Sequence, residues 1–182
     1  QNRGARPLPG DALLLARSLR HPHLHSLFVN DVQWLDPLRR FPCSDRVVHL
    51  PEVAELNPGD GTEAAELRCH LHALEGRVVF LVFGDLSPRK GVITALAAMG
   101  RLTPSQQRRA ALVIAGRSHP SFRQKIHEAA CHLRDHTSVA VLELHRFIRE
   151  EEVAVLFTQA DVVLTLYSGH AGMSNVILLA AA

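Results

Sequence analysis

Cysteine is scarce in this chain, with three residues in 182, and their spacing argues against a disulfide framework. Cys43, Cys69 and Cys131 lie far apart, whereas small secreted domains held by disulfides contain many closely spaced cysteines. No apolar run approaches the roughly 20 residues of a transmembrane helix, and the first residues lack the pattern of a signal peptide. We therefore expect reduced thiols and a cytoplasmic location, with or without peripheral attachment to a membrane.

An excess of one charge is also absent. The 20 Lys and Arg residues and the 18 Asp and Glu residues are interspersed, and the net charge is +2 with histidine neutral. Nucleic-acid-binding domains are far more basic, so we expect no nucleic-acid partner. The histidine-rich segments His21–His25 and Cys69–His72 lack the paired spacing of a structural zinc site, so we expect no metal.

Two glycine motifs of nucleotide-binding enzymes are missing as well. The chain contains neither the G-x-G-x-x-G motif of dinucleotide enzymes nor the G-x-x-x-x-G-K-[ST] loop of P-loop proteins. Their absence argues against a nicotinamide dehydrogenase and against a P-loop nucleotidase.

What the chain does contain is a regular alternation of strand and helix patterns after residue 62. Strands that alternate with helices indicate the α/β class, a parallel sheet with helices on both faces. The predicted strands are Val78–Phe83, Ala110–Ala115, Ser138–Leu144 and Val162–Leu166. The predicted helices are Glu63–Leu74, Val92–Leu102, Ser121–Arg134, Glu150–Ala160 and Ser174–Ala182.

The first 50 residues predict a shorter α/β segment. Helical patterns cover Asp11–Leu19 and Val32–Arg40, the second interrupted by Pro37, and Ser26–Val29 and Arg46–Leu50 have strand patterns. Residues 51–62 are rich in proline, glycine and acids and form the best candidate linker. We therefore expect residues 1–50 and 63–182 to belong to different domains.

Two helix starts carry recognisable capping signals. Thr103 and Gln106 have the spacing of a capping box with Pro104 at the first helical position, which predicts a small additional helix. Glu150–Glu152 fall in the first turn of a predicted helix, where negative charge offsets the helix dipole. We interpret these glutamates as helix-capping residues.

A basic pair lies in the loop after the first buried strand of the second part. Val78–Phe83 ends at Gly84, and Arg89 and Lys90 come just before the next predicted helix. Because parallel sheets bind ligands at the carboxyl ends of their strands, the pair predicts an anionic ligand. A solvated basic pair is the alternative.

A glycine-containing loop, Leu166–Asn175, follows the last predicted strand. Gly169 and Gly172 permit a tight backbone, and Ser174 and Asn175 can cap the next helix. A helix N-terminus suits a phosphate, and the two loops open on the same edge of a parallel sheet. We therefore expect both loops to converge on one diphosphate; an ordinary glycine loop before a capped helix is the alternative.

Together these segments resemble the nucleotide-sugar-binding domain of the group 1, or family 4, retaining glycosyltransferases, which have two Rossmann-like domains in the GT-B fold. The matching segments are FGDLSPRKGV at 83–92, LVIAG at 112–116, FIREEEVAVLFTQADVVLTLY at 147–167 and HAGMS at 170–174. HLPEVAEL at 49–56 is similar to the family's interdomain connection. The resemblance implies that residues 1–50 are the tail of the acceptor-side domain, that 63–182 are an incomplete donor domain, and that the chain is truncated at both ends.

The same resemblance implies a sugar transferred with retention from a nucleotide-diphosphate donor to a sugar, lipid or protein acceptor, without a metal or other cofactor. It assigns no catalytic residue. The residues that it places at the donor are Gly84, Arg89, Lys90, His170, Gly172, Met173, Ser174 and Asn175.

The chain departs from this family at two glutamates. Family members commonly have His-Glu-Gly-Phe-Gly, with the glutamate near the donor sugar, and a second glutamate on the following helix that contacts the ribose. Ala171 and Leu179 occupy these positions here. One alternative is therefore a catalytically silent relative that binds a nucleotide or a protein partner. The other is a sugar-nucleotide epimerase with a tightly bound dinucleotide, against which the missing glycine motif argues.

Overall fold

The computed structural model describes residues 9–41, 43–57, 61–169 and 174–182. The chain folds as two compact units, residues 1–53 with 171–175 and residues 54–170 with 176–182. Each unit contains a parallel sheet, with two strands in the first unit and four in the second. The second unit carries the predicted basic loop.

A four-stranded parallel sheet in the order β5-β4-β3-β6 forms the centre of the second unit. Its strands are β3 (Val78–Phe83), β4 (Ala110–Ala115), β5 (Ala140–Leu144) and β6 (Val162–Val163). Val78 pairs with Ala110, and Ala111 pairs with Ala140. All residues of the central strand β4 are buried, as expected for a strand covered on both faces. The predicted Rossmann-like sheet is confirmed.

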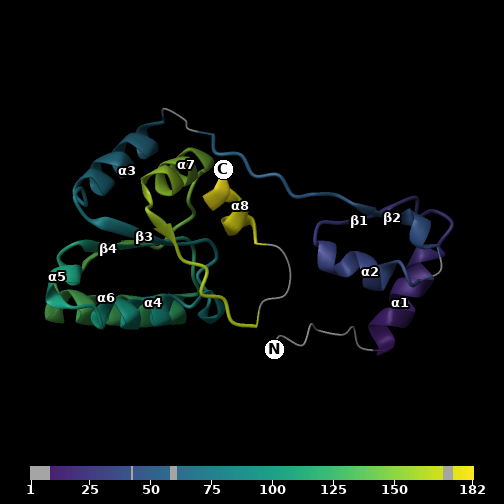
Figure 1. Cartoon of the computed structure of the whole chain (residues 1–182), viewed down its shortest axis with the longest axis horizontal. Coiled ribbons are helices and arrows are strands. Elements are labelled where there is room, and N and C mark those ends of the chain that lie inside the picture. The colour runs from purple at the N-terminus through teal and green to yellow at the C-terminus, as the bar shows by residue number, and fades with distance from the viewer. Residues whose placement is uncertain (1–8, 42, 58–60, 170–173) are drawn as a thin grey trace. The chain divides into compact units, whose positions relative to one another are not determined.

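Helices cover both faces of this sheet (Figure 1). On one face lie α3 (Thr62–His72), α7 (Glu150–Gln159) and α8 (Asn175–Ala181), and on the other lie α4 (Val92–Gly100) and α6 (Pro120–His136). Side chains of β4 alternate between the two layers, as the period of a strand requires. The short helix α5 (Pro104–Gln107) begins with the capping box predicted at Thr103.

The first unit contains α1 (Pro9–Leu19), two short strands and short helical turns. The strands β1 (Leu27–Val29) and β2 (Val47–His49) pair in parallel. One Arg46 nitrogen, Nη1, donates to the carbonyls of Leu19 and Leu24 at 3.0 and 2.8 Å. This cation therefore satisfies carbonyl groups at and after the end of α1, where no intrahelical donors remain.

The predicted interruption at Pro37 is wrong. The structure has a 3-10 turn, η1 (Val32–Trp34), followed by the single-turn helix α2 (Leu35–Leu38), and Pro37 lies inside α2. Amide groups in the first turn of a helix have no intrahelical acceptor, so a proline there removes no hydrogen bond.

The last predicted strand is shorter than its sequence pattern. The sequence pattern predicts a strand over Val162–Leu166, whereas only Val162–Val163 pairs with β3. Beyond β6 the chain packs closely on Gly91, where an added Cβ would overlap the Leu166 carbonyl oxygen. Gly91 has a φ of 70°. The segment after Val163 therefore packs against the loop before α4 instead of continuing the strand.

Candidate functional site

The predicted basic pair lies in a short 3-10 turn, η3 (Pro88–Lys90), between β3 and α4. Lys90 is buried, with 7% of its surface exposed. Its ammonium group donates to the Tyr167 hydroxyl at 2.9 Å and to the Phe83 carbonyl at 3.3 Å. A buried cation is costly unless it is hydrogen-bonded, and these two oxygens hold it at the carboxyl end of β3.

Tyr167, the single tyrosine of the chain, contacts both cations of the pair. The Arg89 guanidinium carbon is 5.5 Å from its ring centroid, and the Lys90 ammonium is 4.4 Å from it. Both distances lie within the range of cation–π attraction. The Ser168 amide also donates to the Arg89 carbonyl at 3.0 Å. The structure thus joins the loop after β3 to the segment after β6 through a residue to which sequence analysis gave no role.

Gly84 lies against the Lys90 side chain. It has a φ of 112°, and a Cβ at this position would be 3.2 Å from the Lys90 ammonium nitrogen. Glycine here allows the close approach of the lysine side chain to the backbone. The predicted approach of a donor to Gly84 stays a prediction.

A cavity of about 230 Å³ opens at the carboxyl ends of β3, β4 and β5. Three loops line it, one after each of these strands. The lining residues are Phe83, Gly84, Asp85, Gly116, Arg117, Arg146, Phe147 and Ile148. This edge is where parallel sheets bind ligands, and Gly84 connects the cavity to the loop of Lys90.

Arg146 is held at the cavity by the buried carboxylate of Glu152. Both terminal guanidinium nitrogens donate to this carboxylate, Nη1 over 2.8 Å. Glu152 is 0% exposed and also accepts the Arg149 amide at 3.0 Å, which confirms its predicted role in capping α7. Hydrogen bonds from Arg146 lower the pKa of Glu152 despite its burial, and the same contact raises the pKa of Arg146. The pair is therefore ionised.

An exposed aromatic ring and a second arginine complete the rim of the cavity. Phe147 is 64% exposed, and the Arg117 guanidinium carbon is 5.3 Å from its ring centroid. Guanidinium groups bind phosphate oxygens, and aromatic faces stack on flat rings. Sequence analysis missed Arg117, Arg146 and Phe147, although each follows the carboxyl end of a predicted strand, the same signal that identified Arg89.

Part of the predicted site lies outside the described residues, namely His170, Ala171, Gly172 and Met173. Ser174 is buried and Asn175 begins α8, and both group with the first unit. The expected convergence of this segment with the basic loop stays a prediction. Leu179, which stands where the family has a ribose-binding glutamate, is partly buried against an apolar core of the second unit.

Neither a membrane-spanning helix nor a metal-binding group is found within the described part of the chain. None of its helices is long and apolar enough to cross a bilayer. No three His, Cys, Asp or Glu side chains in that part are arranged so that they could hold a metal ion.

Solved structures with a similar fold include proteins named as glycosyltransferases. Anabaena Alr3699/HepE in complex with UDP and glucose matches with a TM-score of 0.64 and 14% identity, over 94% of this chain and 45% of that one. A UDP-forming trehalose-phosphate synthase from Burkholderia xenovorans matches with a TM-score of 0.61 and 16% identity, over 95% of this chain and 46% of that one. WaaG, a glycosyltransferase involved in lipopolysaccharide biosynthesis, matches with a TM-score of 0.59 and 20% identity, over 85% of this chain and 41% of that one. The chain thus spans less than half the length of each.

The sequence itself matches one protein family. No curated protein matches the chain significantly by pairwise comparison. The sequence profile of the group 1 glycosyl transferases matches residues 64–180, which include every strand of the four-stranded sheet and the loops that line the cavity. Since this match covers more than half of the chain, the chain belongs to the group 1 glycosyl transferases.

Proposed function

We propose that the second unit binds the nucleotide-diphosphate part of a sugar donor and that the protein transfers the sugar with retention. The observation that carries the proposal is the cavity at the strand ends, with Arg117 and Arg146 in its lining and the Lys90 loop beside it. A site with several fixed cations and an exposed aromatic ring suits an anion joined to a flat base. One protein of similar fold, Anabaena Alr3699/HepE, has been crystallised with UDP and with UDP-glucose, which agrees with this ligand class.

The chemistry assigns a clear task to the basic pair. In retaining transfer the bond from the sugar to the diphosphate breaks through an oxocarbenium-like transition state, and negative charge develops on the leaving group. Fixed cations stabilise that charge without reorganisation. An ammonium group has three N–H donors, and the two bonds from Lys90 to Tyr167 and Phe83 leave one for a phosphate oxygen. Because protein side chains supply these cations, the proposed reaction needs no metal.

The proposal also assigns the two parts of the chain. Residues 63–182 form the donor-binding domain, and residues 1–50 belong to the acceptor-side domain. The acceptor is a sugar, a lipid or a protein.

Calorimetric titration of the 182-residue chain with UDP, GDP and ADP tests donor binding. We expect at least one nucleoside diphosphate to bind and the Arg89→Ala/Lys90→Ala variant to lose at least tenfold in affinity. Each charge-assisted contact contributes about 1.5–3 kcal/mol, and about 1.4 kcal/mol corresponds to tenfold.

Arg123→Ala, at an exposed position on α6, is the matched control and should bind as the unmodified chain does. Because Lys90 is buried, Arg89→Ala alone provides a variant that keeps the lysine contacts intact. Unchanged affinity in both basic-loop variants, or no binding by the unmodified chain, would contradict the assignment.

A further inference from the structure

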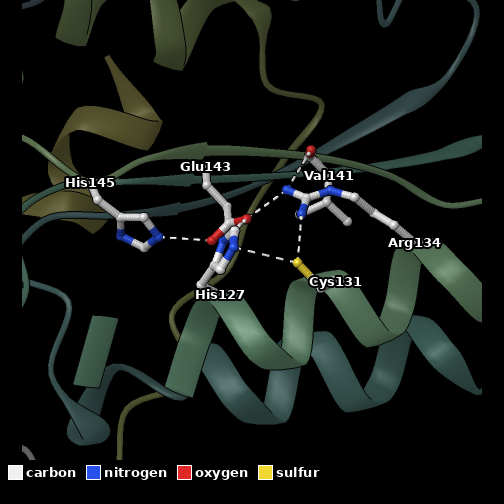
Figure 2. Close-up of polar contacts among 6 residues, drawn as sticks. All are labelled: His127, Cys131, Arg134, Val141, Glu143 and His145. Carbon is white, nitrogen blue, oxygen red and sulfur yellow. Dashed lines mark hydrogen bonds and ion pairs between the residues drawn. The ribbon is translucent and has the colours of Figure 1, made fainter. Parts of the chain in front are cut away.

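A second polar cluster lies between the edge strand β5 and helix α6 (Figure 2). Its centre is the Glu143 carboxylate, whose side chain is 8% exposed. Arg134 Nη2 donates to Oε1 at 2.6 Å, His127 Nδ1 lies 3.3 Å from the same oxygen, and His145 Nε2 lies 2.8 Å from Oε2. Burial raises the pKa of Glu143, but the hydrogen bonds from His145 and Arg134 outweigh burial, so the pKa is lowered. The carboxylate is therefore ionised and accepts from three side chains.

His127 connects this carboxylate to a thiol. Cys131 follows one helical turn later on α6, and its Sγ is 3.5 Å from His127 Nε2. An ionised carboxylate only accepts hydrogen bonds, so the contact with Glu143 places the imidazole proton on Nδ1. The lone pair of Nε2 then faces the thiol. Figure 2 shows His127 in contact with Cys131 and beside Glu143. Thiol, imidazole and carboxylate thus follow the order of nucleophile, base and orienting group in cysteine-dependent catalysis.

A cation also lies beside the sulfur. Arg134 Nη1 donates toward Sγ at 3.8 Å while its Nη2 holds Glu143. The acidic group of the cluster, Glu143, has its charge offset by Arg134 and is in hydrogen-bond contact with two imidazoles. Helix α4, which packs against α6, contains no ionisable residue. The Arg134 guanidinium is therefore placed to stabilise negative charge on the sulfur as its proton passes to His127.

The thiol is also within reach of small molecules. Cys131 is half-buried, and the side chains beside it, His127 and Arg134, are 56% and 36% exposed. Cys69 on α3 is exposed and provides an internal reference in the same chain.

We propose that Cys131 is a nucleophilic modification site that His127 activates, and that its reactant is a peroxide. The thiol proton passes to His127 Nε2 as sulfur attacks one peroxide oxygen and the O–O bond breaks. The departing hydroxide takes that proton from His127 and leaves as water. Sulfur is oxidised to the sulfenic acid, and the peroxide is reduced to water.

Competitive labelling of the 182-residue chain measures this activation. The chain receives less than one equivalent of iodoacetamide at pH 7, and mass spectrometry of the peptides gives the rate at each cysteine. We expect Cys131 to react faster than the more exposed Cys69. His127→Gln should slow Cys131 about tenfold or more, since a positioned base is lost. The matched control is His132→Gln, at a position that stacks on His136 at 4.2 Å on the same helix, and it should leave the rate unchanged.

Loss of structure and loss of the base give different patterns across the three cysteines. Unfolding of His127→Gln would expose all three thiols, so it would raise the rate at half-buried Cys43 and bring the three rates together, whereas loss of the base alone slows Cys131 and leaves Cys43 and Cys69 unchanged. A second measurement treats the chain with hydrogen peroxide and traps sulfenic acid with dimedone, and the adduct should form at Cys131 and decrease in His127→Gln. The proposal is overturned if Cys131 reacts no faster than Cys69, if His127→Gln leaves its rate unchanged, or if no adduct forms there.

Discussion

Glu152 caps helix α7 and also binds Arg146, one of the cations that line the cavity. Its two oxygens accept from the Arg146 guanidinium and from the Arg149 amide, and no part of the residue is exposed. A buried carboxylate that loses its cation is strongly destabilising, so each member of this pair fixes the other. Arg146 therefore reaches the cavity from a defined position rather than as a freely rotating surface side chain.

The pH dependence of stability should reveal this pair. The pKa of Glu152 is lower in the folded chain than in an unfolded one, where a glutamate has a pKa of about 4.3. Its contribution to the free energy of unfolding is therefore complete above that pH and is lost as the pH falls through the folded value. We expect Glu152→Gln to cost about 1.5–3 kcal/mol at neutral pH and progressively less in acid.

Urea unfolding at a series of pH values from neutral to acid measures this difference. Glu151→Gln, at the exposed neighbouring position, is the control and should follow the unmodified chain. A Glu152→Gln variant that loses the same free energy of unfolding at every pH would show that the carboxylate is not held by its charge.

At the scale of elements, the sequence predicts what lies in the middle of the sheet better than what lies at its edges. β3 and β4 have the predicted bounds because their residues are apolar throughout and flanked by glycine and polar residues. β6 is shorter than its pattern because the contact between Gly91 and Leu166, distant in sequence, draws the chain away.

The candidate site also combines residues that can be predicted from the local sequence with residues that cannot. Arg89 and Lys90 could be predicted, since the sequence shows a basic pair in the loop after a buried strand. The partners of Lys90 and the ion pair of Arg146 depend on which loops meet in three dimensions. Tyr167 and Glu152 therefore became part of the site only with the structure.

Helix α8 offers a test of the family's glutamate position. Leu179 packs against the apolar core beside α3 and α7, so a carboxylate there loses apolar burial and must be desolvated or displace the helix. We expect Leu179→Glu to lower the thermal midpoint by several degrees, equivalent to about 1–3 kcal/mol. Thermal unfolding followed by circular dichroism measures it. Ile177→Glu, at a position 50% exposed on the same helix, should have little effect, and equal midpoints for both variants would contradict the packing.

For the whole molecule, the apolar cores indicate which part of the chain can fold independently. The residues of the two core clusters on the faces of the four-stranded sheet, including those packed against them, lie between Leu56 and Leu179. We therefore expect residues 54–182 to fold without the first 53. The measurement is cooperative thermal unfolding of this fragment, with a midpoint close to that of the corresponding transition in the full chain. A fragment without a cooperative transition would show that its core depends on residues 1–53.

The Glu143 cluster has a consequence for how the sheet is assembled. Within the described part of the chain β5 is an edge strand that pairs with β4, and its apolar residues Leu142 and Leu144 face the layer of α3 and α7. Because side chains alternate along a strand, sliding β5 by one residue would turn Glu143 into that apolar layer, away from its donors on α6. A register error would therefore bury an unpaired charge. The hydrogen bonds of the Glu143 carboxylate therefore favour the native register of β5 over a register shifted by one residue.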